Sequence, residues 1–115
     1  MCGISGVLSD NRNNSTDIKR IASVMSSILS HRGPDDSGLW INPENICAMS
    51  HSRLAIIDLS SAGHQPMSSQ CGRYTIVFNG EIYNHHYLKV ELENNRLSNA
   101  TWKGRSDTEI LLEAI

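Results

Sequence analysis

Short apolar runs and segments of helical spacing alternate along this chain. Residues 4–8 form an apolar run that predicts a strand, and a polar turn follows it. Apolar residues then recur every three or four positions, which predicts an amphipathic helix over about residues 17–30, ended by Gly33 and Pro34. The apolar face of this helix consists of Ile18, Ile21, Ala22, Met25, Ile28 and Leu29.

The rest of the chain predicts more elements of both kinds. Strands are expected at 38–41 and at 46–50 with a continuation through 58, on either side of a turn at 42–45, and again at 74–78. Residues 59–72 are rich in Ser, Gly, His and Pro and predict a loop. Helices are expected over 84–94, capped by Asn84, and from Ser106 onward, where Ser106 and Glu109 have capping-box spacing. This mixture predicts an α+β fold.

The last predicted helix ends on apolar Ile115. The predicted sheet has short strands and no device that protects an edge from pairing with another strand. We therefore expect residues 1–115 to be the front part of a longer domain. The alternative is a compact small protein with a helical C-terminus.

Composition narrows the class of protein. A hydrophobic fraction of 39% and a charged fraction of 19% are typical of a globular chain rather than a disordered one. The net charge of −2 gives no reason to expect nucleic acid or an anionic membrane as partner, and no apolar run is long enough to span a membrane. The three cysteines are too sparse for a disulfide framework and no signal peptide is visible, which favours the cytoplasm.

Cys2 directly follows the initiator methionine. Removal of Met1 would leave a thiol and a free α-amine on one residue. Because an α-amine titrates near about pH 8 and a cysteine thiol near about 8.5, the amine can accept the thiol proton. This pairs a nucleophile with its own general base. Taken by itself, a cysteine at this position is more often incidental.

Other polar residues have a structural and a catalytic interpretation. Asn79-Gly80 after a strand is a common hairpin turn, but an Asn amide and a Gly N–H can also form an oxyanion hole. Arg53 could grip a substrate carboxylate, or it could form an ion pair with Asp58 or another acid of the protein. Asp107 could bind a substrate ammonium or merely complement a helix dipole.

The sequence gives little support for a metal or nucleotide site. Cys47 and His51 are four residues apart and His85 and His86 are adjacent, but no third ligand has motif spacing. Glycine-rich nucleotide-binding motifs are absent from the sequence. We therefore predict no metal and no cofactor in this chain.

The order of the motifs is more specific than any one of them. The chain contains, in order, CGISG, HRGPDDSG, HSRLAIIDLS, GHQPM, FNGEIYN and RSDTEILL. Together they closely resemble the glutaminase domain of asparagine synthetases, which are class II glutamine amidotransferases. The resemblance is weakest over residues 89–104. It implies an N-terminal nucleophile hydrolase fold, an α/β/β/α sandwich of mainly antiparallel sheets, here incomplete at the C-terminus.

The resemblance also implies a role for each matching residue. Cys2 would attack the side-chain amide of glutamine, and Asn79 and Gly80 would form the oxyanion hole. Arg53 would hold the α-carboxylate and Asp107 the α-ammonium. Further substrate contacts would come from Leu54, Ile56, Ile57 and Glu81.

The family continues beyond such a domain with a synthetase domain, absent from these residues, that binds ATP and Mg²⁺ and transfers ammonia to aspartate. The resemblance thus implies glutamine as substrate here, and aspartate or a related acceptor in the missing domain. A homodimer is compatible with the sequence. Two alternatives stay open: the glutaminase half of another class II amidotransferase, and a non-catalytic fragment that keeps the fold.

Overall fold

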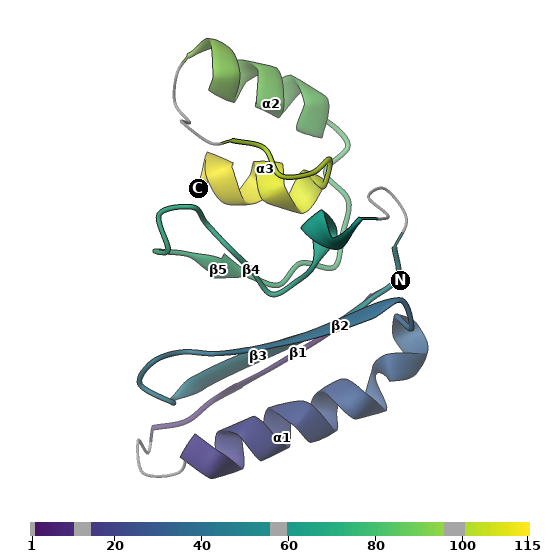
Figure 1. Cartoon of the computed structure of the whole chain (residues 1–115), viewed down its shortest axis with the longest axis vertical. Coiled ribbons are helices and arrows are strands. Elements are labelled where there is room, and N and C mark those ends of the chain that lie inside the picture. The colour runs from purple at the N-terminus through teal and green to yellow at the C-terminus, as the bar shows by residue number, and fades with distance from the viewer. Residues whose placement is uncertain (1, 11–14, 56–59, 96–100) are drawn as a thin grey trace.

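The computed structural model describes residues 2–10, 15–55, 60–95 and 101–115 (Figure 1). Strands β1 (Gly3–Leu8), β2 (Asp36–Ile41) and β3 (Cys47–Arg53) form an antiparallel sheet in the order β1-β3-β2. Strands β4 (Met67–Ser68) and β5 (Thr75–Ile76) form a second antiparallel pair. The combination of helices with antiparallel sheets confirms the α+β class.

Helix α1 (Ser15–Ile28) covers one face of the larger sheet. Its buried residues Ile18 and Ala22 pack with Ala48 of β3, and Val7 and Ile41 complete this small core. The buried face of this helix is narrower than the predicted apolar face, because Ile21 and Ile28 are exposed. The helix also ends earlier, and a short 3-10 helix, Ser30–Arg32, leads toward β2.

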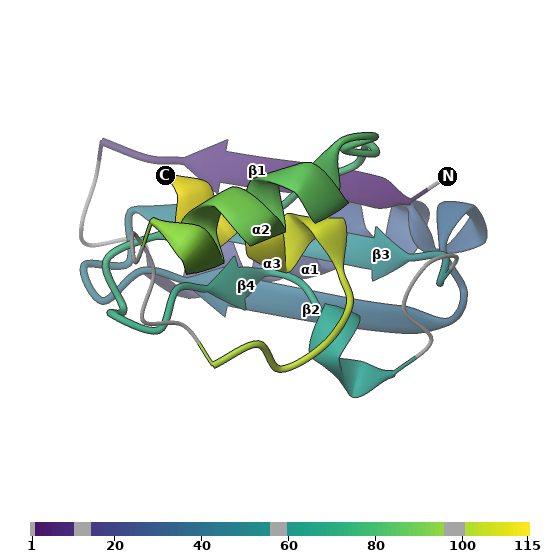
Figure 2. The same ribbon diagram turned by 90° about the horizontal axis from the view of Figure 1, so that it is seen from above.

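The other face of the larger sheet looks toward the β4–β5 pair (Figure 1). Helices α2 (His85–Asn94) and α3 (Asp107–Ala114) pack against each other on the far side of that pair. Seen from above, both helices overlie the larger sheet (Figure 2). The molecule is therefore layered, with α1, the larger sheet, the β4–β5 pair and the two remaining helices in succession (Figure 1).

Other predicted elements also differ from the structure: β5 covers only Thr75–Ile76 of the strand expected at 74–78, and β2 begins at Asp36 rather than at 38. The strand expected through residue 58 ends at Arg53, because the N–H of Ala55 donates instead to Oδ2 of Asp35 at 2.8 Å; residues 56–58 of that prediction lie outside the described residues. The segment 59–72, expected as a loop, contains a 3-10 helix, Ser61–Gly63, and strand β4. The turn at 42–45 is confirmed, with Oδ1 of Asn42 accepting hydrogen bonds from the N–H groups of Ile46 and Cys47.

Candidate active site

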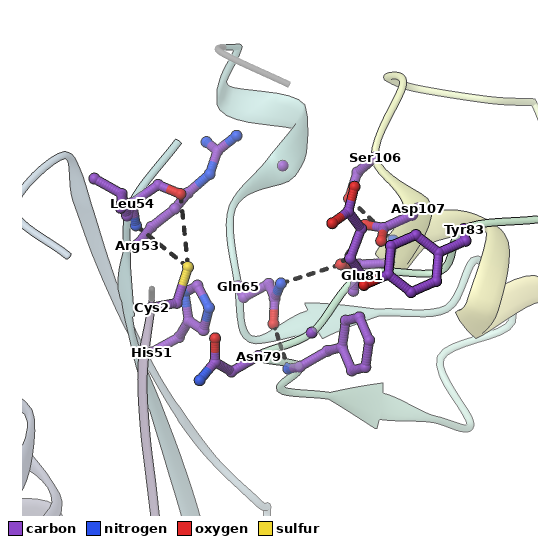
Figure 3. Close-up of a pocket in the computed structure, with 14 residues that line it drawn as sticks. Cys2, His51, Arg53, Leu54, Gln65, Asn79, Glu81, Tyr83, Ser106 and Asp107 are labelled. Atoms are coloured by element: carbon purple, nitrogen blue, oxygen red, sulfur yellow. Dashed lines mark hydrogen bonds between the residues drawn. The ribbon is translucent and has the colours of Figure 1, made fainter. Parts of the chain in front are cut away.

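A pocket of about 350 Å³ lies where the end of the larger sheet meets the segment after β5 and the start of α3 (Figure 3). Residues far apart in the sequence converge on it. Those named by sequence analysis are Cys2, Arg53, Leu54, Asn79, Gly80, Glu81 and Asp107. Ile56 and Ile57, the remaining predicted substrate contacts, lie outside the described residues.

The antiparallel register of β1 and β3 brings Cys2 to the pocket. Gly3 is paired with Ser52, so the residue before β1 lies beside the residues that end β3. The sulfur of Cys2 is 3.3 Å from the backbone nitrogen of Leu54 and 3.6 Å from its carbonyl oxygen. Cys2 is half-buried, so its sulfur remains open to the pocket.

Arg53 is the last residue of β3, and its side chain is 8% exposed. Alternation along the strand puts it on the face opposite Ala48, which packs with α1. Its Nη1 donates to the carbonyl oxygen of Ser60 at 2.8 Å. A Cβ on Gly63 would overlap the guanidinium, so glycine leaves the room that the arginine occupies. Asp58, the alternative partner considered from the sequence, lies outside the described residues.

Asn79 and Gly80 follow β5 but do not form a hairpin turn. The described chain runs from them through a short turn into α2, with no strand after them. The hairpin interpretation is therefore wrong. Both residues are exposed, and Figure 3 shows the Asn79 side chain extending toward the wall formed by Cys2 and His51.

Asp107 is the first residue of α3 and is 6% exposed. Its Oδ2 accepts a hydrogen bond from the N–H of Ile82 at 2.8 Å, which ties the segment after Asn79 to this helix. Glu81 and Asp107 lie together across the pocket from Arg53 (Figure 3). A ligand with an anionic group at one end and a cationic group at the other would match Arg53 on one side of the pocket and the two acids on the other.

The predicted capping box at the start of α3 is only half correct. Ser106 is the N-cap, and its hydroxyl accepts from the N–H of Thr108 at 3.2 Å. The carboxylate of Glu109 accepts instead from the N–H groups of Lys103 and Gly104, at 2.7 and 3.1 Å. Glu109 therefore fixes the loop that enters the helix.

Comparison with known proteins identifies the family. The whole chain, residues 1–115, matches the glutamine amidotransferase domain family. The chain belongs to this family. It is 39% identical to asparagine synthetase 3 of Bacillus subtilis over 99% of the chain. It is 36% identical to asparagine synthetase B of Escherichia coli over 97%, and 39% identical to asparagine synthetase 1 of Arabidopsis thaliana over 96%. The resemblance inferred from the motifs is confirmed.

The chain spans only a small part of each relative. It covers 18% of the length of the Bacillus and Arabidopsis proteins and 19% of the Escherichia coli protein, in each case a glutamine-hydrolysing asparagine synthetase. The matched region covers nearly all of this amidotransferase domain.

His51 is a pocket residue of the amidotransferase domain that sequence analysis considered only as a metal ligand. It is 1% exposed, and neither ring nitrogen has a hydrogen-bond partner among the described residues. Burial lowers the pKa of His51; the backbone at Phe78 acts in the opposite direction, and the charge of Arg53 lowers it further. Its position two residues before Arg53 was the available signal, because such residues share one face of a strand.

Gln65 and Thr108 also line the pocket and were not singled out from the sequence. Gln65 was noted only as part of the GHQPM motif, and its side chain lies between the two walls in Figure 3. In the described part of the amidotransferase domain, no group of three or more His, Cys, Asp or Glu side chains is arranged to hold a metal ion. No described helix is long and apolar enough to cross a membrane.

Proposed function

We propose that this domain hydrolyses the side-chain amide of glutamine to glutamate and ammonia, with Cys2 as the nucleophile. The observation that supports this best is the pocket itself, which collects a thiol, an Asn-Gly pair, a cation and two carboxylates from distant segments. The family match and the names of the relatives point to the same reaction.

The chemistry requires that Met1 be removed. The α-amine of Cys2 then takes the thiol proton, and the thiolate attacks the amide carbon of glutamine. The amide oxygen becomes an oxyanion, which the Asn79 side-chain amide and the Gly80 N–H stabilise. As the carbon–nitrogen bond breaks, the α-ammonium of Cys2 returns the proton to the departing ammonia. Water then attacks the γ-glutamyl thioester, which releases glutamate and restores the thiol.

The charged residues would fix the substrate at both ends. Arg53 binds the α-carboxylate, and Asp107 with Glu81 binds the α-ammonium. Contacts from Leu54, and from Ile56 and Ile57 in the segment outside the described residues, would complete the site. Because both charged groups are anchored, the length of the side chain decides whether its amide reaches the sulfur. This accounts for a preference for glutamine over asparagine.

The fold and the wider role extend this proposal. The two antiparallel sheets would be those of an N-terminal nucleophile hydrolase sandwich, with the nucleophile at the start of β1. In a longer protein that also carries a synthetase domain, the ammonia would serve asparagine formation from aspartate, with ATP and Mg²⁺ bound by that second domain. The asparagine synthetases among the relatives support this role.

The proposal is tested by supplying glutamine labelled with ¹⁵N in its side-chain amide. We expect labelled ammonia and glutamate in equal amounts, and no comparable release from asparagine. An absence of glutamate release, in protein whose N-terminus has been shown to begin at Cys2, would refute the proposal.

A further inference from the structure

We propose that Gln65 is a positioning residue that holds the oxyanion donors and the ammonium anchor of the pocket in a fixed relation to each other. This inference rests on the glutaminase function proposed above. It assigns a role in that reaction to a side chain that transfers no proton and forms no bond to the substrate.

Both halves of the Gln65 amide are used, one on each side of the site. Its Oε1 accepts a hydrogen bond from the N–H of Phe78 at 2.6 Å, and its Nε2 donates to Oγ1 of Thr108 at 3.2 Å. The orientation of the amide follows from chemistry, because a backbone N–H can only donate and must face the oxygen. Phe78 directly precedes Asn79, and Thr108 directly follows Asp107.

Burial makes this connection costly to break. Gln65 is 6% exposed and Thr108 is 3% exposed, so water cannot easily replace either hydrogen bond. The N–H of Phe78 is part-buried, so losing its acceptor would leave it poorly satisfied. The backbone at Phe78 would therefore shift to recover a partner, and the adjacent Asn79 would move with it.

The main chain of Gln65 is fixed as well. A Cβ on Gly38 of β2 would overlap the carbonyl oxygen of Gln65, so these two backbones are in close contact. His64, the preceding residue, places its Nδ1 2.7 Å from Oδ2 of Asp36 on the same strand. The backbone of Gln65 is thus held against the larger sheet, and its side chain reaches the segment after β5 and the start of α3 (Figure 3).

The experiment compares volume-matched and conservative variants. Gln65→Met keeps the length of the side chain but removes both hydrogen bonds. Thr108→Val removes the acceptor for Nε2 and also the hydroxyl that donates to Oδ1 of Asp107 at 3.5 Å, whereas Thr108→Ser keeps both contacts. Kinetics with glutamine are expressed per active site, counted by covalent labelling of Cys2 with 6-diazo-5-oxo-L-norleucine, so that loss of folded protein does not count as loss of rate.

We expect Gln65→Met to lower kcat about tenfold to a hundredfold, because small displacements of catalytic groups have effects of that size. Thr108→Val should raise KM severalfold through Asp107, with kcat less affected, and Thr108→Ser should stay within about twofold of the unmodified protein. The combined loss of kcat/KM in Gln65→Met/Thr108→Val should be smaller than the product of the two single losses, because both variants remove the same Gln65–Thr108 hydrogen bond.

Two results would overturn the inference. One is a Gln65→Met protein whose kcat and KM per labelled site are unchanged, with only its thermal stability lowered. The other result applies if Gln65→Met does not fold. In that case, equal KM values for Thr108→Val and Thr108→Ser would overturn the inference. An unmodified protein without glutaminase activity would refute the proposed function instead, so the two failures are distinct.

Discussion

The backbone N–H of Leu54 donates a hydrogen bond to the sulfur of Cys2 across 3.3 Å, between residues that are 52 positions apart in the chain. The contact joins the start of β1 to the end of β3. It gives the sulfur of Cys2 a hydrogen-bond donor that belongs to the main chain. The position of the Cys2 sulfur in the pocket is thus linked to the pairing of these two strands.

The first prediction concerns the nucleophile. Cys2→Ala should lower glutamine hydrolysis by about a thousandfold or more, because no other group replaces the thiolate. Glutamate release is the measurement. Cys71→Ala is the matched control, since Cys71 is exposed and does not line the pocket. Equal losses in the two variants would remove the special role of Cys2.

Two acids of α3 should have separable effects. Asp107→Asn keeps an oxygen for the N–H of Ile82 but loses the negative charge, so KM for glutamine should rise about tenfold or more. Glu109→Gln weakens the hydrogen bonds to Lys103 and Gly104 and should lower the melting temperature with little change in KM. Steady-state kinetics and thermal melts of both variants check this. A reversed pattern would contradict the assignment of Asp107.

Gly63→Ala should impair binding rather than folding. The added Cβ would overlap the far end of the Arg53 side chain, which can move aside without disturbing the backbone. We expect KM for glutamine to rise severalfold because the guanidinium is displaced, while the melting temperature changes little. A sharply lower melting temperature with an unchanged KM would show that Gly63 is needed for folding and not for the position of Arg53.

Because of His51, the free energy of unfolding should decrease as the pH falls below neutrality. Since burial lowers its pKa, the native ring stays neutral to a lower pH than the unfolded ring, whose pKa is about 6.5. Above that value both states are neutral and His51 adds no pH dependence. Below it the unfolded state binds the proton first, so the free energy of unfolding decreases.

The measurement is the difference in melting temperature between pH 7 and pH 5. It should be larger for the unmodified protein than for His51→Leu, whose side chain does not titrate. The variant isolates His51 from the pair formed by Asp36 and His64, which both proteins retain. An identical pH dependence in the two proteins would contradict the effect of burial on His51.

The sequence predicted the elements better than their ends. The helical spacing of Ile18 and Ala22 correctly predicted α1, because both residues face the same core. The end of β3 could not be found in this way, since it depends on Ala55 donating to Asp35 rather than continuing the ladder. The polar run from Ser50 to Arg53 is buried, which a hydrophobic pattern does not predict.

Ser50, Ser52 and Arg53 in this run are stabilised by hydrogen bonds, whereas neither ring nitrogen of His51 has a partner among the described residues. The hydroxyls of Ser5 and Ser50 are 2.6 Å apart, and Ser52 donates to the carbonyl oxygen of Ser26 in α1. The candidate site shows the same limit. Its motifs could be recognised one by one and in their order, but the Cys2–Leu54 contact depends on strand register, and no local pattern encodes a partner 52 residues away.

The central claim is that an unblocked Cys2 is the nucleophile. Its most direct test is treatment of the protein with 6-diazo-5-oxo-L-norleucine, an electrophilic mimic of glutamine, followed by mass spectrometry of the intact protein and its peptides. We predict a mature chain that begins at Cys2, with one adduct on that sulfur and protection by glutamine. A chain that retains Met1, or a Cys2 that stays unlabelled while Cys71 reacts, would contradict the account.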